Sequence, residues 1–278
     1  MGAIFHNVPV IALTATANKE DRKGIKESLG LKKCIEVIGN PDRRKIFYAK
    51  YFRKGQDIDS IEAILMPIAE HLLLLGTGYP ITVIYLPLKW CGFAYKLFES
   101  VLGNDQYYPK NSFAVPKNRL FGQFHAPQTN DMKEEILQQL TSPNSAVRVV
   151  FATIAMGMGV DIPSIRHIIH IGPPRTIQEF LQETGRAGRD GKPSRAVLYY
   201  NNRDIANNKV GLQEFVRSYC KSDESCLRVQ LLQFLDVDAP KPLNPQHDCC
   251  SVCETLCSCS LCKTNSELNN IATMFVSM

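Results

Sequence analysis

Two patterns of apolar and polar residues alternate along the middle of the chain. Short apolar runs rich in β-branched residues are typical of buried strands, and apolar residues that recur every three to four positions are typical of one face of a helix. The expected strands are residues 81–88, 119–126, 146–153, 165–172 and 195–201. The expected helices of this region are residues 89–103 and 129–140, and residues 176–188 are expected to begin as a helix. Strands that alternate with helices predict a parallel sheet with helices on both faces.

The segments on either side of this region follow other patterns. The elements expected before it are a strand at 8–16, a helix at 18–31 that ends at Gly30, short strands around the Asn40–Pro41 break, and a helix at 58–76. The elements expected after it are helices at 204–219 and 224–235, a proline-rich connector at 236–248 and a cysteine cluster.

Composition and charge are those of an ordinary globular protein. The chain has 278 residues, of which 45% are hydrophobic and 21% are charged, with a net charge of +5 that permits an anionic partner without requiring one. The N-terminus lacks the basic start and apolar core of a signal peptide. The most apolar run, residues 71–90, contains two glycines and two prolines, so a helix end, a turn and a strand explain it better than a membrane span. We therefore expect a protein that is neither secreted nor inserted in a membrane.

The stretch "QETGRAGRDG", residues 182–191, carries two arginines among small residues. Three glycines in seven residues are unfavourable in a helix, since each costs about 1 kcal/mol relative to alanine. Guanidinium groups stay charged and contact several phosphate oxygens at once. The composition indicates backbone close to a ligand, with Arg186 and Arg189 directed at it; taken alone, the stretch also fits a surface loop with an ordinary salt bridge. Ligands of parallel sheets bind at the carboxyl ends of the strands, and we expect this stretch and "FATIAMGMGVD" to lie there.

Ten cysteines are spread unevenly along the chain. Six of them lie between residues 249 and 262, and Cys226 stands alone upstream of these. A disulfide framework usually extends through the whole of a small secreted domain, so this clustering favours a metal site instead.

Several segments together resemble the motifs of one enzyme family. "ALTATA" (12–17), "ATIAMGMGVDIPSIRHIIHIGPPRT" (152–176) and "QETGRAGRDG" resemble, in order and separation, the third, fifth and sixth motifs of superfamily 2 helicases. The last two resemble the RecQ family of DNA helicases in particular, and "NPDRRKIFY" is similar to that family's linker between two RecA-like domains. The resemblance extends from about Val8 to Cys253.

The resemblance implies a RecA-like parallel sheet flanked by helices, followed by a small helical zinc-binding subdomain. The implied domains are the edge of a first RecA-like domain with the linker (1–45), a second RecA-like domain (46–201), a helical zinc-binding domain (202–262) and a tail (263–278). The implied function is ATP-dependent, 3′ to 5′ unwinding of DNA in repair and recombination. Single-stranded DNA, duplex junctions and repair proteins are the implied partners, and the implied location is the nucleus in a eukaryote or otherwise the cytoplasm.

The resemblance also assigns a nucleotide site for ATP with Mg²⁺. The arginines of the sixth motif, by position Arg186 and Arg189, reach the nucleotide across a cleft between domains, and we expect Arg189 to be the arginine finger. Gln182, one helical turn before Arg186, is expected to hold the motif in place. The remaining nucleotide-site residues are Gly185 and Gly188, which allow close backbone approach, Gly157 and Gly159, which form a turn, and Asp161, which either accepts from a ribose hydroxyl or bridges to the sixth motif.

The DNA contacts that the resemblance implies come from separate segments. They are Thr14, Thr16, Lys89, His125 and Thr153. The family's fourth motif carries a Ser-Arg pair where this chain has Leu88 and Lys89, and a lysine holds a phosphate as a point charge without the bidentate geometry of arginine. Taken alone, the two threonines of "ALTATA" fit an ordinary turn, and His125 fits a structural residue after a strand.

For the cysteines, the resemblance implies one zinc ligand on a helix and three in a later knuckle. The matching set is Cys226, Cys249, Cys250 and Cys253. A rival set is Cys250, Cys253, Cys259 and Cys262, although its two CxxC pairs are only five residues apart and structural zinc sites usually separate their pairs further. Reduced or disulfide-bonded cysteines are the third alternative, and His247 is expected to be a bystander.

The 278 residues contain no "GxxxxGK[ST]" loop to hold phosphates and no Asp-Glu-x-His segment ahead of "ALTATA" to hold Mg²⁺. We therefore expect the chain to be the C-terminal half of a motor and to hydrolyse no measurable ATP by itself. The alternative is a truncated, inactive paralogue that binds DNA or proteins.

Overall fold

The computed structural model describes residues 9–55, 57–153, 161–162 and 164–262, which fall into two compact units. The first, here called the sheet unit, is Ala49–Lys221. The second, here called the cysteine unit, combines the described residues of 9–48 with those of 222–262, so it joins segments from both ends of the chain. The division falls inside strand β1 (Ile46–Phe52).

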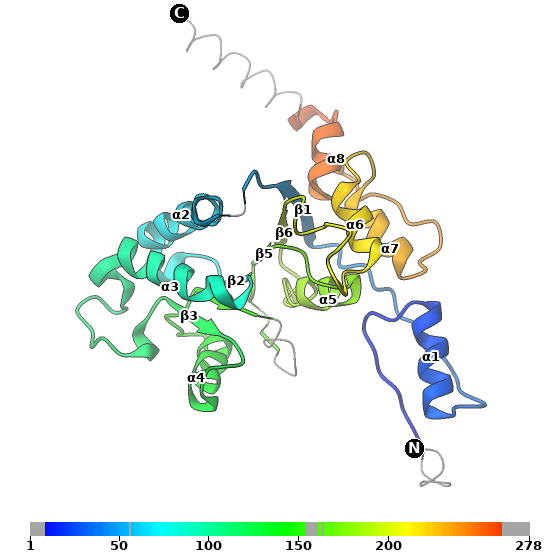
Figure 1. Ribbon diagram of the computed structural model, residues 1–278, viewed down its shortest axis with the longest axis horizontal. Helices are drawn as coiled ribbons and strands as arrows, with labels where there is room; N and C mark the ends of the chain where they lie inside the picture. Colours follow the sequence, from blue (N-terminus) through cyan, green and yellow to red (C-terminus); the bar gives the residue numbers. More distant parts are fainter. Residues whose placement is uncertain (1–8, 56, 154–160, 163, 263–278) are drawn as a thin grey trace, which may run out of the picture. The chain divides into compact units, whose positions relative to one another are not determined.

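A parallel sheet is the framework of the sheet unit (Figure 1). In the described part of the chain its strands stand in the order β1-β6-β5-β2-β4-β3. The strands after β1 are β2 (Thr82–Tyr85), β3 (Phe121–Phe124), β4 (Val149–Ala152), β5 (His167–Ile171) and β6 (Ser194–Tyr200). The pairs β2–β4, β2–β5, β3–β4 and β5–β6 are parallel. Directly after the edge strand β1, the Arg53 backbone nitrogen donates to the carbonyl of Tyr200 in β6 at 2.8 Å.

The helices in the described residues of the sheet unit are α2 (Ile58–Leu75), α3 (Leu88–Leu102), α4 (Asn130–Thr141), α5 (Ile177–Thr184) and α6 (Glu214–Lys221). Helices α2, α4 and α5 begin at side-chain caps that are visible in the sequence. Asp57 and Thr129 accept from the backbone of the first turns of α2 and α4, and Thr176 forms a reciprocal capping box with Glu179 at α5. Each cap satisfies backbone N–H groups that the first helical turn leaves unpaired.

Helices cover both faces of the sheet because successive side chains of a strand point to opposite faces. Ile84 belongs to the apolar core that Phe98 of α3 shares with α2. The next residue, Tyr85, instead stacks on His170, and the His170 ring lies 5.1 Å from that of Phe180 in α5. The predicted parallel sheet with helices on both faces is confirmed.

The cysteine unit is mostly helical. Its α-helices in the described residues are α1 (Lys19–Leu29), α7 (Leu227–Phe234) and α8 (Ser251–Leu256). Asn18 and Asp21 form a capping box at the start of α1, and the helix ends at Gly30 with φ of 67°, as predicted. The conformation is left-handed, which glycine adopts without strain.

Two expected strands are absent from the described residues of this unit. Residues 9–16 and 34–38 form no strand, and their apolar side chains face solvent, as at Leu13 (91% exposed) and Val37 (92% exposed). The prediction of strands there was wrong because an apolar run becomes a strand only beside another strand, and no described segment pairs with these residues. The helix expected at 204–219 was also too long, since only Glu214–Lys221 is helical.

The apolar run 71–90 divides between the end of α2, a 3₁₀ turn, β2 and the start of α3. No helix in the described ranges is both long and apolar enough to cross a bilayer.

Candidate functional sites

The loop after α5, residues 185–191, has a backbone that depends on glycine. Gly188 has φ of +59°, and a Cβ atom there would lie 2.7 Å from Ser194 Oγ and 2.8 Å from the Lys192 carbonyl oxygen. The Gly188 nitrogen donates to the Ile165 carbonyl at 3.0 Å. A side chain at residue 188 would therefore clash with Ser194 and Lys192, whereas Gly185 has an ordinary helical φ of −63°. The expected approach of these two glycines to a nucleotide stays a prediction.

This loop lies at the amino ends of the strands. Ile165 comes just before β5 and Ser194 begins β6. Arg166 stabilises the loop, because it donates hydrogen bonds to Asp190 and, at 3.1 Å, to Ser194 Oγ. The expectation that the loop lies at the carboxyl ends was wrong, because α5 starts at the carboxyl end of β5 and returns along the sheet before the loop begins.

The two arginines of the loop have different surroundings. Arg189 is partly exposed (36%), and its Nη1 donates to Asp161 Oδ1 at 2.7 Å. This is one of the two roles expected for Asp161, the bridge to the sixth motif. Arg186 is buried beside Tyr85. Burial raises the pKa of the Tyr85 phenol, and the negative charge of Glu183 raises it further, whereas the positive charge of Arg186 lowers it. In this conformation only Arg189 is accessible to a ligand.

A buried hydrogen bond between side chains joins α5 to the sheet. Glu183 Oε2 lies 2.7 Å from His170 Nε2, and both side chains are almost fully buried. Gln182, which was expected to hold the motif in place, is exposed. This contact was not predicted, although the sequence holds one signal for it: His170 is a polar residue inside an apolar strand, and such a residue needs a buried partner.

A cavity of about 400 Å³ opens at the carboxyl ends of the strands. Its lining includes Thr153, which was expected to contact DNA, and the residues that adjoin Lys89 and His125, namely Leu88 and Ala126. The Thr153 nitrogen donates to the Phe124 carbonyl at 3.1 Å and so fixes the end of β4 against β3. Two cations that the sequence analysis did not single out, Arg175 and Lys209, also line the cavity.

Lys89 and His125 differ in burial and in their side-chain contacts. Lys89 is exposed in the first turn of α3, with Nζ 4.9 Å from the Trp90 ring centroid. His125 is half-buried, and its Nε2 lies 2.9 Å from Gln123 Oε1. The Gln123 amide donates to the Cys91 carbonyl, so its oxygen is the acceptor and Nε2 of the histidine carries the hydrogen. Burial lowers the pKa of His125, and the neutral form is thus favoured.

The other predicted site residues lie apart from these. Thr14 and Thr16 belong to the cysteine unit, where the Thr16 nitrogen lies 3.5 Å from Thr14 Oγ1. Gly157 and Gly159 lie outside the described residues.

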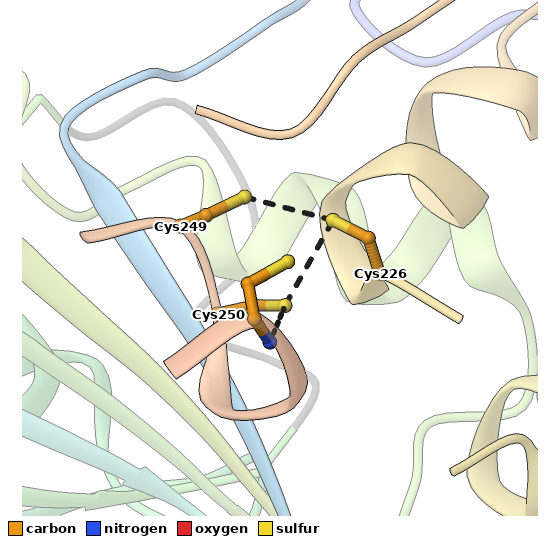
Figure 2. Close-up of side chains that lie close together, drawn as sticks. Cys226, Cys249 and Cys250 are labelled. Atoms are coloured by element: carbon orange, nitrogen blue, oxygen red, sulfur yellow. Dashed lines mark hydrogen bonds between the residues drawn. The ribbon is translucent and has the colours of Figure 1, made fainter. Parts of the chain in front are cut away.

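Four cysteines of the cysteine unit come together as one group, here called the first group: Cys226, Cys249, Cys250 and Cys253. Their sulfur atoms all lie within 4.8 Å of one another. Cys226, at the start of α7, reaches the two cysteines that precede α8 (Figure 2). Its sulfur is 3.6 Å from that of Cys249 and 3.8 Å from that of Cys250. Two thiolates bound to one zinc at tetrahedral angles lie about 3.8 Å apart, so the group can hold one metal ion.

The backbone supports this first group. The sulfur of Cys250 accepts from the Leu227 nitrogen at 3.4 Å and from the Cys253 nitrogen at 3.5 Å, and it thereby caps α8. Hydrogen bonding with Cys226, and then with Cys249, lowers the pKa of Cys250 and favours its thiolate. A thiolate is the form that binds metal.

Four other side chains of the cysteine unit also come together, here called the second group: His247, Cys257, Cys259 and Cys262. The Nδ1 atom of His247 lies 3.5 Å from the sulfur of Cys257, 3.3 Å from that of Cys259 and 3.4 Å from that of Cys262. The rival set is thus not assembled among the described residues, since its four cysteines are divided between the two groups. The expectation that His247 is a bystander disagrees with this placement: the short 3₁₀ turn before Cys249 brings its ring to the three sulfurs.

Comparisons with known proteins place this geometry in a family. A family model described as the helicase conserved C-terminal domain matches residues 108–191, which contain β3, β4, β5 and α5. The chain is 24% identical to ATP-dependent DNA helicase Q-like 2 of Arabidopsis thaliana over 283 residues, covering 99% of this chain and 36% of the relative. It is 28% identical to ATP-dependent DNA helicase RecQ of Haemophilus influenzae over 268 residues, covering 90% of this chain and 38% of the relative. These matches support the C-terminal part of a RecQ-family, superfamily 2 helicase.

Two solved structures share the fold of this chain. A structure of Mss116p bound to ssRNA and AMP-PNP superposes with a TM-score of 0.53 at 15% identity, covering 82% of this chain and 39% of that one. A structure of S. cerevisiae Dbp5 bound to RNA and ADP BeF3 gives a TM-score of 0.50 at 14% identity, covering 80% and 54%. These likenesses establish a RecA-like helicase fold. The chain spans well under half the length of the curated RecQ-family relatives named above.

Proposed function

We propose that this chain supplies the second motor lobe and the metal-binding module of an ATP-dependent, 3′ to 5′ DNA helicase that acts in repair and recombination. The observation that carries the proposal is Arg189, a partly exposed guanidinium on a glycine-dependent loop, oriented by Asp161. DNA rather than RNA is proposed as the substrate because the two curated relatives described above are named as DNA helicases. Repair proteins are proposed as partners, and the nucleus as the location in a eukaryote.

The surroundings of Arg189 suit an arginine finger. Its pair with Asp161 is exposed, and such pairs contribute only about 0–1 kcal/mol, so transfer of the guanidinium to a γ-phosphate costs little. Once there, it would stabilise the charge that develops during phosphoryl transfer. The loop itself is held by Arg166 and by the Gly188 backbone, so Arg189 can reorient while the loop keeps its position.

The phosphate-binding loop and the Mg²⁺ ligands are proposed to come from another lobe. The exposed apolar side chains of 9–16 and 34–38 support this proposal, because such a lobe would cover them. Arg186 is proposed to act from its buried position by supporting the loop.

DNA is proposed to bind along the carboxyl ends of the strands. Thr153, Arg175 and Lys209 line the cavity there, and Lys89 is exposed in the adjoining first turn of α3. Backbone phosphates dominate the binding of such surfaces, so the affinity should fall with rising salt. Nucleotide and DNA would then be held at opposite ends of the same strands.

The first group of cysteines is proposed to hold a structural Zn²⁺. Four thiolates suit zinc better than Mg²⁺ or Ca²⁺, and a site with four protein ligands leaves no position open for catalysis. When bound, the ion would cross-link the start of α7 to the segment before α8.

The nucleotide assignment can be tested in a chimera that joins the phosphate-binding lobe of the Haemophilus relative to this chain. DNA-stimulated ATP hydrolysis is expected, and Arg189→Ala should lower kcat by about 10³-fold, because an arginine finger acts on the transition state. Lys117→Ala, which removes an exposed charge elsewhere in the sheet unit, serves as the control and should leave kcat unchanged.

Two results would contradict the proposal. The first is turnover of ATP by the 278-residue chain alone. The second is a chimera that binds single-stranded DNA but hydrolyses no ATP, which is the behaviour expected of an inactive binding paralogue.

A further inference from the structure

We propose that His247, Cys257, Cys259 and Cys262 form a second zinc site, in addition to the first group. The proposal does not depend on helicase activity. It rests on four side chains that converge on one point in the cysteine unit, within the described residues.

The distances fit a tetrahedral ion. A nitrogen and a sulfur bound to one zinc at about 2.0 Å and 2.3 Å lie about 3.5 Å apart at tetrahedral angles. The His247 Nδ1 atom is 3.3–3.5 Å from each of the three sulfurs. All ligand atoms lie within 4.8 Å of one another, as in the first group.

Hydrogen bonds explain this arrangement poorly. One ring nitrogen of histidine either donates one hydrogen or accepts with one lone pair, so it satisfies a single thiol. Three sulfurs at nearly equal distances around one nitrogen are better satisfied by a cation placed among all four atoms.

The ligands favour zinc and a structural role. Three thiolates with one imidazole are among the usual ligand sets of structural zinc, and soft sulfur ligands disfavour Mg²⁺ and Ca²⁺. The other ring nitrogen, Nε2, lies 3.7 Å from Asp248 Oδ1. This distance is too long for the hydrogen bond that a metal-bound histidine often donates to a carboxylate, so Asp248 contributes only a nearby negative charge.

The position of the second group in the chain explains what the ion would do. Helix α8 has only six residues, and isolated helices of that length are unstable. Cys250 of the first group caps its start, and Cys257 of the second group stands at its end. An ion at each end would hold the helix. The second group shares no ligand with the first, so either ion can be lost without removing a ligand from the other.

The proposal can be tested by zinc analysis and native mass spectrometry of the full chain, purified under reducing conditions. About two zinc ions per chain are expected. Cys259→Ser and His247→Ala should each lower the content to about one, and so should Cys226→Ser, through the first group. Cys34→Ser removes an exposed cysteine outside both groups and should keep two ions.

X-ray absorption of the wild-type protein provides a test that needs no variant. It should show sulfur with a minor nitrogen contribution, because one ion would have four sulfurs and the other three sulfurs and one nitrogen.

Three outcomes would overturn the proposal. One is a wild-type chain with a single zinc that Cys226→Ser removes and Cys259→Ser keeps. Another is a zinc shell of sulfur alone, or a different metal in the second group. The third is a disulfide among Cys257, Cys259 and Cys262, found by thiol trapping and mass spectrometry of the purified chain.

Discussion

At the scale of single residues, two glycines of the loop after α5 (residues 185–191, here called the arginine loop) are required for different reasons. Gly188 and Gly191 both have positive φ, +59° and +77°. A Cβ atom at Gly188 would meet Ser194 Oγ and the Lys192 carbonyl at less than 3.0 Å, whereas a Cβ at Gly191 would meet nothing within 4 Å. Alanine variants at these two positions therefore separate the loss of stability caused by a left-handed backbone from the additional loss caused by a steric clash.

We predict that Gly188→Ala destabilises the sheet unit more than Gly191→Ala. The left-handed conformation costs a residue with a Cβ about 1–2 kcal/mol, and the clash at residue 188 should bring the total to roughly 2–4 kcal/mol. Urea unfolding followed by the fluorescence of Trp90 measures this, because the chain's single tryptophan lies in α3 of the sheet unit. Equal shifts for the two variants would show that residue 188 has room for a methyl group.

At the scale of elements, a buried arginine attaches α7 to the segment before β1. Arg228 is 1% exposed, and its Nη1 donates to Asp42 Oδ1 at 2.5 Å and to the Arg43 carbonyl at 3.1 Å. Its Nη2 donates to the Ile46 carbonyl, and its guanidinium lies 5.2 Å from the centre of the Tyr48 ring. The helix that begins with a metal-group cysteine is thereby joined to the predicted interdomain linker.

We predict that Arg228→Met destabilises the cysteine unit by about 3–5 kcal/mol, because it removes the buried donor of the Asp42 carboxylate and of the Ile46 carbonyl. The Arg43 carbonyl keeps its hydrogen bond from the Ile46 nitrogen. Arg228→Lys should restore only part of this, since an ammonium group cannot form the same fork. Hydrogen exchange of the α7 amides is the measurement, and Arg44→Met, at an exposed arginine nearby, is the control. Unchanged α7 protection in Arg228→Met would contradict the assigned role.

The elements also show what the sequence can predict. The strands from β2 to β6 were predictable because apolar runs bounded by turn residues have few alternatives. The loop of residues 185–191 was expected at the wrong edge of the sheet because its position depends on where α5 ends. Helix α5 is about 12 Å long and β5 about 16 Å, so the helix returns along most of the strand before the loop begins. The grouping of His247 with three cysteines depends on a local turn that no spacing rule describes.

At the scale of the whole molecule, the two units are stabilised differently. The sheet unit has a large apolar core between its sheet and helices. The cysteine unit buries few large apolar side chains in its described residues, and three of its buried residues are cysteines of the first group. Small units with little core usually need a metal or disulfides to fold, and all ten cysteines are free here.

We therefore predict that removing metal with a chelator unfolds the cysteine unit and leaves the sheet unit folded. Structural zinc sites have apparent binding free energies of about 10–16 kcal/mol, more than a unit of this size is expected to hold as net stability. Hydrogen exchange should show lost protection in α7 and α8, while Trp90 fluorescence and the protection of β2 and β5 stay as before. Added Zn²⁺ should restore α7 and α8, and Mg²⁺, the control, should not. Full protection of α7 and α8 in the metal-free chain would mean that side-chain packing and the Arg228 contacts suffice to fold this unit.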